Sequence, residues 1–149
     1  MGHTILVSAC LLGLNTRYNG EQRSYPEVLR YLKKKGLTPI PVCPEQLAGL
    51  PTPRPSAAFQ TGDGEAVLTG DGSLITEHGD IVTDTFLCGA EQALLVARTC
   101  GCSEALLKER SPSCGSRAVY RNGMLIEGAG VTSALLKQNG IAVFSEEAL

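Results

Sequence analysis

The segment ALLKERSPSCG, residues 105–115, passes from an apolar run through three charged residues into a tight turn that ends on a cysteine. Pro112 fixes its own backbone and restricts Ser111 to an extended conformation. Gly115 allows the chain to leave Cys114 at an angle that other residues resist. The segment therefore predicts a strand, Ser103–Leu107, followed by a rigid turn that holds one thiol in place.

Two more apolar runs end on a cysteine, and both are typical of buried strands. They are Thr4–Cys10 and Leu37–Cys43, and the two prolines of the second run indicate a strand with a free edge or an irregular start. Between them, Tyr25–Lys35 has the pattern of a helix, with Ser24 as its cap and Gly36 as its stop. Strand, helix and strand with short connections predict a right-handed parallel unit.

The segment Gly49–Gly79 is the least regular part of the chain, because three prolines exclude a helix in its first residues. Two similar tetrapeptides, Thr61–Gly64 and Thr69–Gly72, flank the strand-like residues Ala66–Leu68. We interpret this region as a surface excursion that contains a small hairpin. Long loops of this kind often serve a function, so it is a candidate cover for a site.

The remaining segments continue the alternation of helices and strands. The longest helix is predicted at Asp80–Cys100, with Thr83 or Asp84 as its cap. The others are a hairpin that turns at Asn122-Gly123, a helix and a last strand: Ala118–Ile126, Val131–Gln138 and Ile141–Phe144. The pattern predicts one domain over residues 1–149, a three-layer, Rossmann-like α/β fold with a mainly parallel sheet and a small β-hairpin excursion.

Composition narrows the classes of function. The formal net charge is −2, which argues against a nucleic-acid surface and leaves a small-molecule substrate open. No apolar stretch is long enough to span a membrane, and no basic region precedes the first apolar run. We therefore expect a cytoplasmic protein without membrane contact; the oligomeric state stays open.

Six cysteines in a cytoplasmic chain point to metal binding, catalysis or burial, since disulfides are disfavoured there. Sites in open parallel sheets form at the carboxyl ends of the strands. Cys10 and Cys43 end two strands, and Cys114 lies in the turn beyond the third. We therefore expect these three thiols at one rim of the sheet.

The other cysteines and both histidines do not follow this rule. Cys88 is expected as a packed thiol within a helix, and Cys100 and Cys102 fall at the opposite rim. His3 precedes the first strand and His78 lies in a polar loop, so neither is a persuasive fourth ligand. Three thiolates with one open position suit zinc or an iron–sulfur cluster that performs chemistry.

Further polar residues are expected at the same rim. Glu45 can act as a general acid or base, or it can interact with a helix dipole. Ser111 can relay a proton, or it can stabilise the turn. Arg17, Lys108 and Arg110 can add positive charge around a cluster or substrate, or can simply be exposed.

A glycine-rich segment, Gly128–Ser133, opens the helix Val131–Gln138. It lacks the third glycine of a dinucleotide-binding fingerprint. The N-terminus of this helix is nevertheless a possible anion site.

Five segments together resemble a family long catalogued as a domain of unknown function, some of whose members are thiouracil desulfidases. They are Val7–Gly13, Arg17–Gly20, Cys43–Glu45, Pro53–Pro55 and Lys108–Gly115, in the same order as in the family. The resemblance covers nearly the whole chain.

The resemblance implies a 4Fe–4S cluster held by Cys10, Cys43 and Cys114, with one open iron. It further implies a non-redox reaction in which the open iron binds a thiocarbonyl sulfur, water attacks the carbon, and sulfide leaves. The family's acid–base pair corresponds to Glu45 and Ser111. The alternative is a non-catalytic module in which the same thiolates bind zinc or carry sulfur. A third reading is a transferase that uses Cys114 alone.

This sequence departs from the family pattern at two positions of the Arg-Tyr segment. Thr16 and Asn19 stand where related sequences often have a cysteine and an aspartate. The missing thiol and carboxylate argue against a catalytic role for either residue, and the departures leave the preferred thio-compound open.

Overall fold

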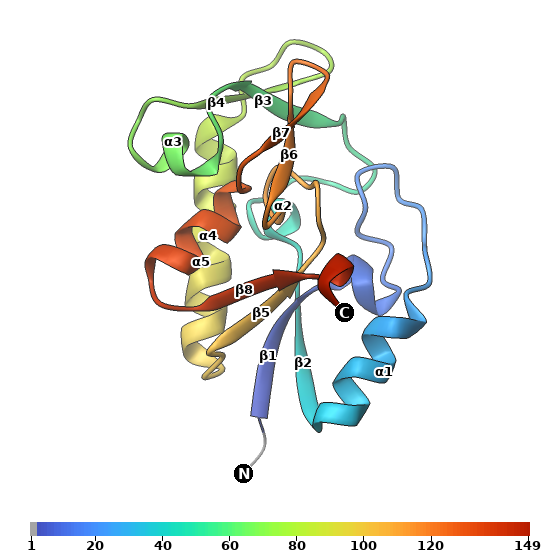
Figure 1. Ribbon diagram of the computed structural model, residues 1–149. Helices are drawn as coiled ribbons and strands as arrows, with labels where there is room; N and C mark the ends of the chain where they lie inside the picture. Colours follow the sequence, from blue (N-terminus) through green and yellow to red (C-terminus); the bar gives the residue numbers. More distant parts are fainter. Residues whose placement is uncertain (1–2) are drawn as a thin grey trace.

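Four parallel strands form the first sheet of the computed structural model, which describes residues 3–149 (Figure 1). Their order is β2 (Leu37–Val42), β1 (His3–Ser8), β5 (Glu104–Leu107) and β8 (Ala142–Ser145). The proline-containing β2 is an edge strand, as predicted, because proline has no N–H to donate to a second neighbour. The first two strands pair along their whole length, from His3 opposite Leu37 to Ser8 opposite Val42.

Helices cover both faces of this sheet, which confirms the three-layer α/β prediction. Ile5 and Val7 of β1 face α1 (Pro26–Lys35), where they pack with Val28. Leu6, between them, faces the other way and packs with Leu94. The helices on that second face are α4 (Thr83–Thr99) and α5 (Val131–Gln138) (Figure 1). Because successive strand residues point to opposite faces, the continuous apolar run of β1 fits a strand buried on both sides.

A second four-stranded sheet lies beyond the carboxyl ends of the parallel strands (Figure 1). Its order is β4 (Ser73–Thr76), β3 (Ala57–Thr61), β6 (Ala118–Arg121) and β7 (Met124–Glu127). The β3–β4 pair and the β6–β7 hairpin are separate in the sequence. They join through one parallel pairing of β3 with β6, between Phe59 and Arg121. Phe59, fully buried, packs with Phe86 of α4, so this long helix supports both sheets.

The interpretation of Ala66–Leu68 as strand-like is wrong. These residues belong to a short helix, α3 (Gly64–Leu68), which connects β3 to β4. The Asp63 carboxylate accepts a hydrogen bond from the Ala66 N–H at 3.1 Å and so caps the helix. Three apolar residues alone do not distinguish a strand from one helical turn, and the Asp-Gly start decided between them.

Two of the three strands end earlier than predicted, and each is followed by a helical turn. Cys10 lies in a 3-10 helix, η1 (Ala9–Leu12), and Cys43 is the residue before α2 (Pro44–Leu47). Both cysteines therefore stand on tight turns just beyond the sheet. The chain ends in a second short 3-10 helix, η2 (Glu146–Ala148).

The predicted helix caps are also wrong, whereas the predicted stop of α1 at Gly36 is confirmed. Tyr25, not Ser24, precedes α1, and Pro26 supplies the preset backbone of its first turn. Val82 precedes α4, and the Thr83 hydroxyl instead accepts a hydrogen bond from the Leu74 N–H at 3.0 Å. Gly36 ends α1 in a left-handed conformation. Within residues 3–149 even the 17-residue α4 is too short and too polar to cross a bilayer.

Candidate functional site

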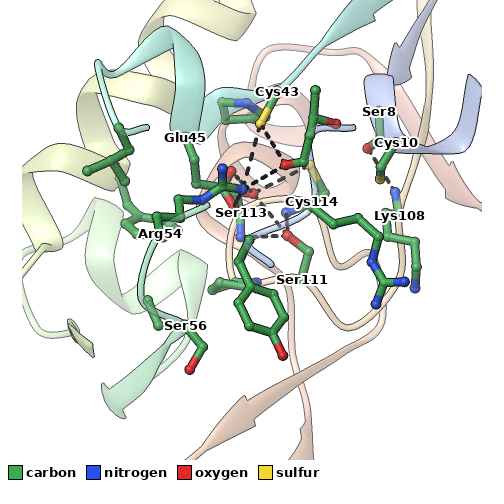
Figure 2. Close-up of a pocket in the computed structure, with 18 of the residues that line it drawn as sticks. Ser8, Cys10, Cys43, Glu45, Arg54, Ser56, Lys108, Ser111, Ser113 and Cys114 are labelled. Atoms are coloured by element: carbon green, nitrogen blue, oxygen red, sulfur yellow. Dashed lines mark hydrogen bonds and ion pairs between the residues drawn. The ribbon is translucent and has the colours of Figure 1, made fainter. Parts of the chain in front are cut away.

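A cavity of about 450 Å³ lies where the second sheet covers the carboxyl ends of β1, β2 and β5. Its floor comes from the turns that follow these strands, and its cover includes Ser56 and, from the second sheet, Ala57, Ala58 and Tyr120. Cys10, Cys43 and Cys114 all line this cavity, as the strand-end rule predicted (Figure 2). A site of this kind, formed by turns on a rigid sheet, holds its side chains in fixed positions.

The other three cysteines lie elsewhere. Cys88 is exposed on α4, so the prediction of a packed thiol is wrong for this residue. Cys102 is buried and contacts the Thr4 hydroxyl at 3.6 Å, at the start of β1. Thr4 also donates a hydrogen bond to the Cys100 carbonyl at 2.7 Å, which places both cysteines at the opposite rim, as predicted.

Burial raises the pKa of all three cavity thiols. For Cys10 the pKa rises to about 11, against the opposing effects of the nearby Lys108 and Arg17 charges. Burial and the Glu45 carboxylate raise the pKa of Cys43 and of Cys114. The thiols are thus neutral near pH 7 when no cation is bound. A bound metal group reverses this preference, because thiolates are its ligands and their protons leave on binding.

The loop that carries Cys114 is organised around the buried carboxylate of Glu109, which is 4% exposed. Its Oε1 accepts hydrogen bonds from the N–H groups of Ser116 and Arg117 at 2.7 and 3.0 Å, and its Oε2 accepts one from the Ser116 hydroxyl at 2.7 Å. Burial opposes ionisation, but these hydrogen bonds outweigh it and lower the pKa of Glu109 to about 2. The carboxylate therefore ties residues 109–118 into one rigid loop.

This arrangement predicts a specific dependence of stability on pH. Because the pKa of Glu109 falls from 4.5 to about 2 on folding, its contribution is complete above pH 4.5 and is lost as the pH falls towards 2. Glu109→Gln should lower the free energy of unfolding by about 2 kcal/mol at pH 7 and by much less at pH 3. Urea unfolding at both pH values measures this, with the exposed Glu21→Gln as control. An equal loss at both pH values would contradict the assignment.

The N-terminus of α5 holds the same loop from the other side, so the predicted anion site is wrong. Its N–H groups are already used: Val131 donates to the Pro112 carbonyl at 3.0 Å, and Thr132 donates to the Ser113 carbonyl at 2.9 Å. A side chain on Gly130 would lie 2.5 Å from the Ser113 carbonyl oxygen, so this close approach requires glycine. The helix end therefore positions the cysteine loop.

Glu45 faces this loop from the first turn of α2 (Figure 2). Its Oε1 accepts a hydrogen bond from the Ser113 hydroxyl at 2.7 Å, and its Oε2 lies 3.7 Å from Nη2 of Arg54. The Ser113 hydroxyl in turn lies 3.0 Å from the Ser111 hydroxyl. The two predicted acid–base residues, Glu45 and Ser111, are therefore connected through Ser113.

Two residues of this group, Ser113 and Arg54, were not singled out from the sequence. Ser113 is adjacent to Cys114, and its own contacts are visible only in the folded loop. Arg54 belongs to the Pro-Arg-Pro segment, and its side chain is 6% exposed. It donates hydrogen bonds to the Thr16 carbonyl and the Thr52 hydroxyl, both at 2.9 Å, and Nη2 lies 3.9 Å from the Cys43 sulfur. A lone arginine between two prolines carries no sequence signal of burial.

The other cationic side chains that line the cavity fall into two groups. Lys108 pairs with Glu146 at 3.1 Å, and Arg110 pairs with Glu147, so both are neutralised by the C-terminal turn. Arg17 lines the cavity from the loop after η1. Both histidines are exposed, and His78 lies in the turn after β4. His3 is the first residue of β1 and does not precede it, which corrects the prediction for its position.

The three cavity cysteines supply thiolates, which both zinc and iron–sulfur clusters take as ligands. In the part of the chain from His3 to Leu149, no three His, Cys, Asp or Glu side chains converge closely enough to surround one metal ion. Three thiolates on one zinc would lie only about 3.8 Å apart, given tetrahedral Zn–S bonds of about 2.3 Å. A four-iron cluster spreads its thiolates farther apart, because each binds a different iron atom.

Comparisons with known proteins agree with one another. The family model described as 2-thiouracil desulfurase matches residues 5–148. The uncharacterized protein YbbK of Bacillus subtilis (strain 168) is 42% identical over 148 residues, which are 97% of this chain and 97% of YbbK. A solved structure described as the 4Fe–4S-dependent thiouracil desulfidase TudS superposes with a TM-score of 0.81 at 43% identity, covering 99% of this chain and 93% of that one.

Proposed function

Because the chain belongs to the 2-thiouracil desulfurase family, we propose that it is an iron–sulfur desulfidase that removes sulfur from a thiolated pyrimidine or a similar small thiocarbonyl compound. The observation that carries the proposal is the cavity, which brings three thiols from distant parts of the chain beside Glu45 and Ser111. The TudS likeness adds the cofactor, since that protein is described as 4Fe–4S-dependent.

Cys10, Cys43 and Cys114 are the proposed ligands. They are the three cysteines that line the cavity, and they stand on three separate turns, which suits attachment to three different irons. When bound, a cluster held by three thiolates supplies an open iron that acts as a Lewis acid towards the thiocarbonyl sulfur and accepts that sulfur. We propose that no net oxidation or reduction accompanies this exchange of sulfur for oxygen.

The chain's own contribution is a directed line of hydrogen bonds. The N–H groups of Cys114 and Ser113 point at the Ser111 oxygen, at 3.1 and 3.3 Å. The single hydroxyl proton of Ser113 is directed to Glu45 at 2.7 Å, because an ionised carboxylate only accepts. The 3.0 Å contact between the two serines is therefore donated by Ser111.

The order of donors in this line sets the direction of proton transfer, from Ser111 through Ser113 to Glu45. A water molecule beside Ser111 can lose its proton to that oxygen, in place of the longer 3.3 Å hydrogen bond from the Ser113 N–H, while the Ser111 proton moves to Ser113 and the Ser113 proton moves to Glu45. One O–H bond of water breaks and one O–H bond of the carboxyl group forms, which leaves a hydroxide nucleophile for the thiocarbonyl carbon. Arg54 pairs with the carboxylate and compensates its charge, since the two side chains are only 6% and 12% exposed.

Anaerobic reconstitution tests the proposal. Incubation with iron and sulfide should yield about four of each per chain, broad visible absorption and conversion of 2-thiouracil to uracil with release of sulfide. Uptake should improve as the pH rises from 6 to 9, because the raised pKa values of the cysteines must be overcome before thiolates can bind. A chain that takes up zinc and never a cluster would instead support the non-catalytic thiolate module.

A further inference from the structure

Arg17 differs from the other cationic side chains that line the cavity. Arg54, Lys108 and Arg110 each pair with a carboxylate: Glu45, Glu146 and Glu147, respectively. For Arg17, in contrast, the contacts among residues 3–149 include no hydrogen bond or ion pair to the guanidinium. The side chain is half-buried at the cavity wall, where an unpaired charge is unfavourable unless something else pairs with it.

The backbone around Arg17 is held in place on both sides. Arg54 donates one hydrogen bond from its side chain to the Thr16 carbonyl at 2.9 Å and one from its backbone N–H to the Tyr18 carbonyl at 2.8 Å. The Arg17 carbonyl itself accepts from the Gly20 N–H at 2.8 Å. The loop thus presents Arg17 from a fixed position, although it has no helix or strand of its own.

The position of the guanidinium relates it to the reaction site. Arg17 and Cys10 both line the cavity, so Arg17 shares this space with one proposed cluster ligand. Glu45 and Ser113 are held on other turns of the cavity floor (Figure 2). A small planar substrate that reached the open iron would therefore have Arg17 within the same cavity wall.

The chemistry of the guanidinium indicates what it binds. Its planar, fixed donors match oxygen acceptors that lie in the plane of a flat group. In a thiolated pyrimidine such as 2-thiouracil, the sulfur is directed to the metal, and the acceptor that remains is the ring carbonyl oxygen. Neutral carbonyl oxygens accept hydrogen bonds from a charged donor more strongly than from a neutral donor.

We infer that Arg17 binds the ring carbonyl oxygen of the substrate and so selects thiolated heterocycles that also carry an oxo group. This inference rests on the proposed function. It assigns a specificity role to a residue whose contribution the sequence left open. It also explains the Arg54 hydrogen bonds to Thr16 and Tyr18, since they hold the loop that carries the Arg17 side chain.

The test combines a substitution in the protein with removal of the ring carbonyl from the substrate. Reconstituted wild type, Arg17→Gln and the control Arg23→Gln are compared on 2-thiouracil and on pyrimidine-2-thione, which lacks the ring carbonyl. Arg23 is exposed on the same loop, away from the residues that line the cavity. Arg17→Gln should raise KM for 2-thiouracil about 10-fold to 100-fold with little change in kcat, and should leave KM for pyrimidine-2-thione nearly unchanged. An equal rise for both compounds would overturn the inference.

A binding measurement separates this inference from the proposed function. Equilibrium dialysis of uracil against the three reconstituted proteins needs no turnover. Loss of uracil binding in Arg17→Gln, with binding kept in wild type and Arg23→Gln, supports the inference even if no desulfurisation is detected. Equal uracil binding by all three proteins, or no binding by wild type, overturns it. Absence of desulfurisation by wild type counts against the proposed function alone.

Discussion

Glu45→Gln is expected to lower the rate of desulfurisation about 10²-fold to 10⁴-fold in the reconstituted protein. Glutamine keeps the size of the side chain and can still accept the 2.7 Å hydrogen bond from Ser113, but it cannot take up the proton that this line of hydrogen bonds delivers. The measurement is uracil formation under single-turnover conditions. Iron and sulfide content should equal those of wild type, because Glu45 is not a proposed ligand.

The effect of this change on folding can be checked separately. Removing the carboxylate leaves Arg54 without its acidic partner, but its contacts to the Thr16 carbonyl and the Thr52 hydroxyl remain. Circular dichroism and thermal unfolding should therefore show a folded variant. Glu21→Gln, on the exposed part of the loop after η1, is the matched control. A folded, cluster-loaded Glu45→Gln variant with the wild-type rate would remove Glu45 from the mechanism.

Cys114→Ser is expected to abolish both stable cluster binding and activity. Cys114 is 4% exposed and stands on the loop that Glu109 and the N-terminus of α5 hold in place, so no other thiol can move into its position. A serine hydroxyl is a poor substitute for a thiolate towards iron. Iron per chain after reconstitution and desalting should fall well below the wild-type value, and 2-thiouracil should not be converted.

The matched control for this prediction is Cys88→Ser. Cys88 is exposed on α4 and does not line the cavity, so its replacement should leave iron content and activity unchanged. Cys10→Ser and Cys43→Ser should behave like Cys114→Ser. If those two variants kept full activity and only Cys114→Ser lost it, the transferase that uses Cys114 alone would be supported instead.

The sequence was a good guide wherever a local pattern has one physical meaning. The apolar run before Cys10, the Asn122-Gly123 turn and the helix Val131–Gln138 all lie in the structure where they were predicted. The grouping of Cys10 with Cys43 and Cys114 followed from one topological rule, that parallel strands end at the same edge of a sheet. The functions of these residues in this chain stay predictions, to be decided by the variants above.

The sequence was a poor guide where a position depends on distant partners. Ser24 and Thr83 have the chemistry of helix caps, yet neither acts as one, because Pro26 begins α1 and Thr83 is hydrogen-bonded to Leu74. The N-terminus of α5 resembled an anion site, but the cysteine loop occupies it. Local propensity describes what a segment can do, and packing decides which of these possibilities is used.

The sequence by itself determined the main strands and helices of the first sheet, their parallel arrangement and the edge at which three thiols lie, because periodicity and strand direction are properties of the chain. Only the tertiary structure decided that Ser113 connects Glu45 to Ser111, that Arg54 is buried, and that Arg17 alone among the cavity cations of residues 3–149 lacks an acidic partner. Each of these contacts joins residues from separate turns across the cavity. Side-chain hydrogen bonds and ion pairs depend on separations of a few ångströms, which no spacing along a chain specifies.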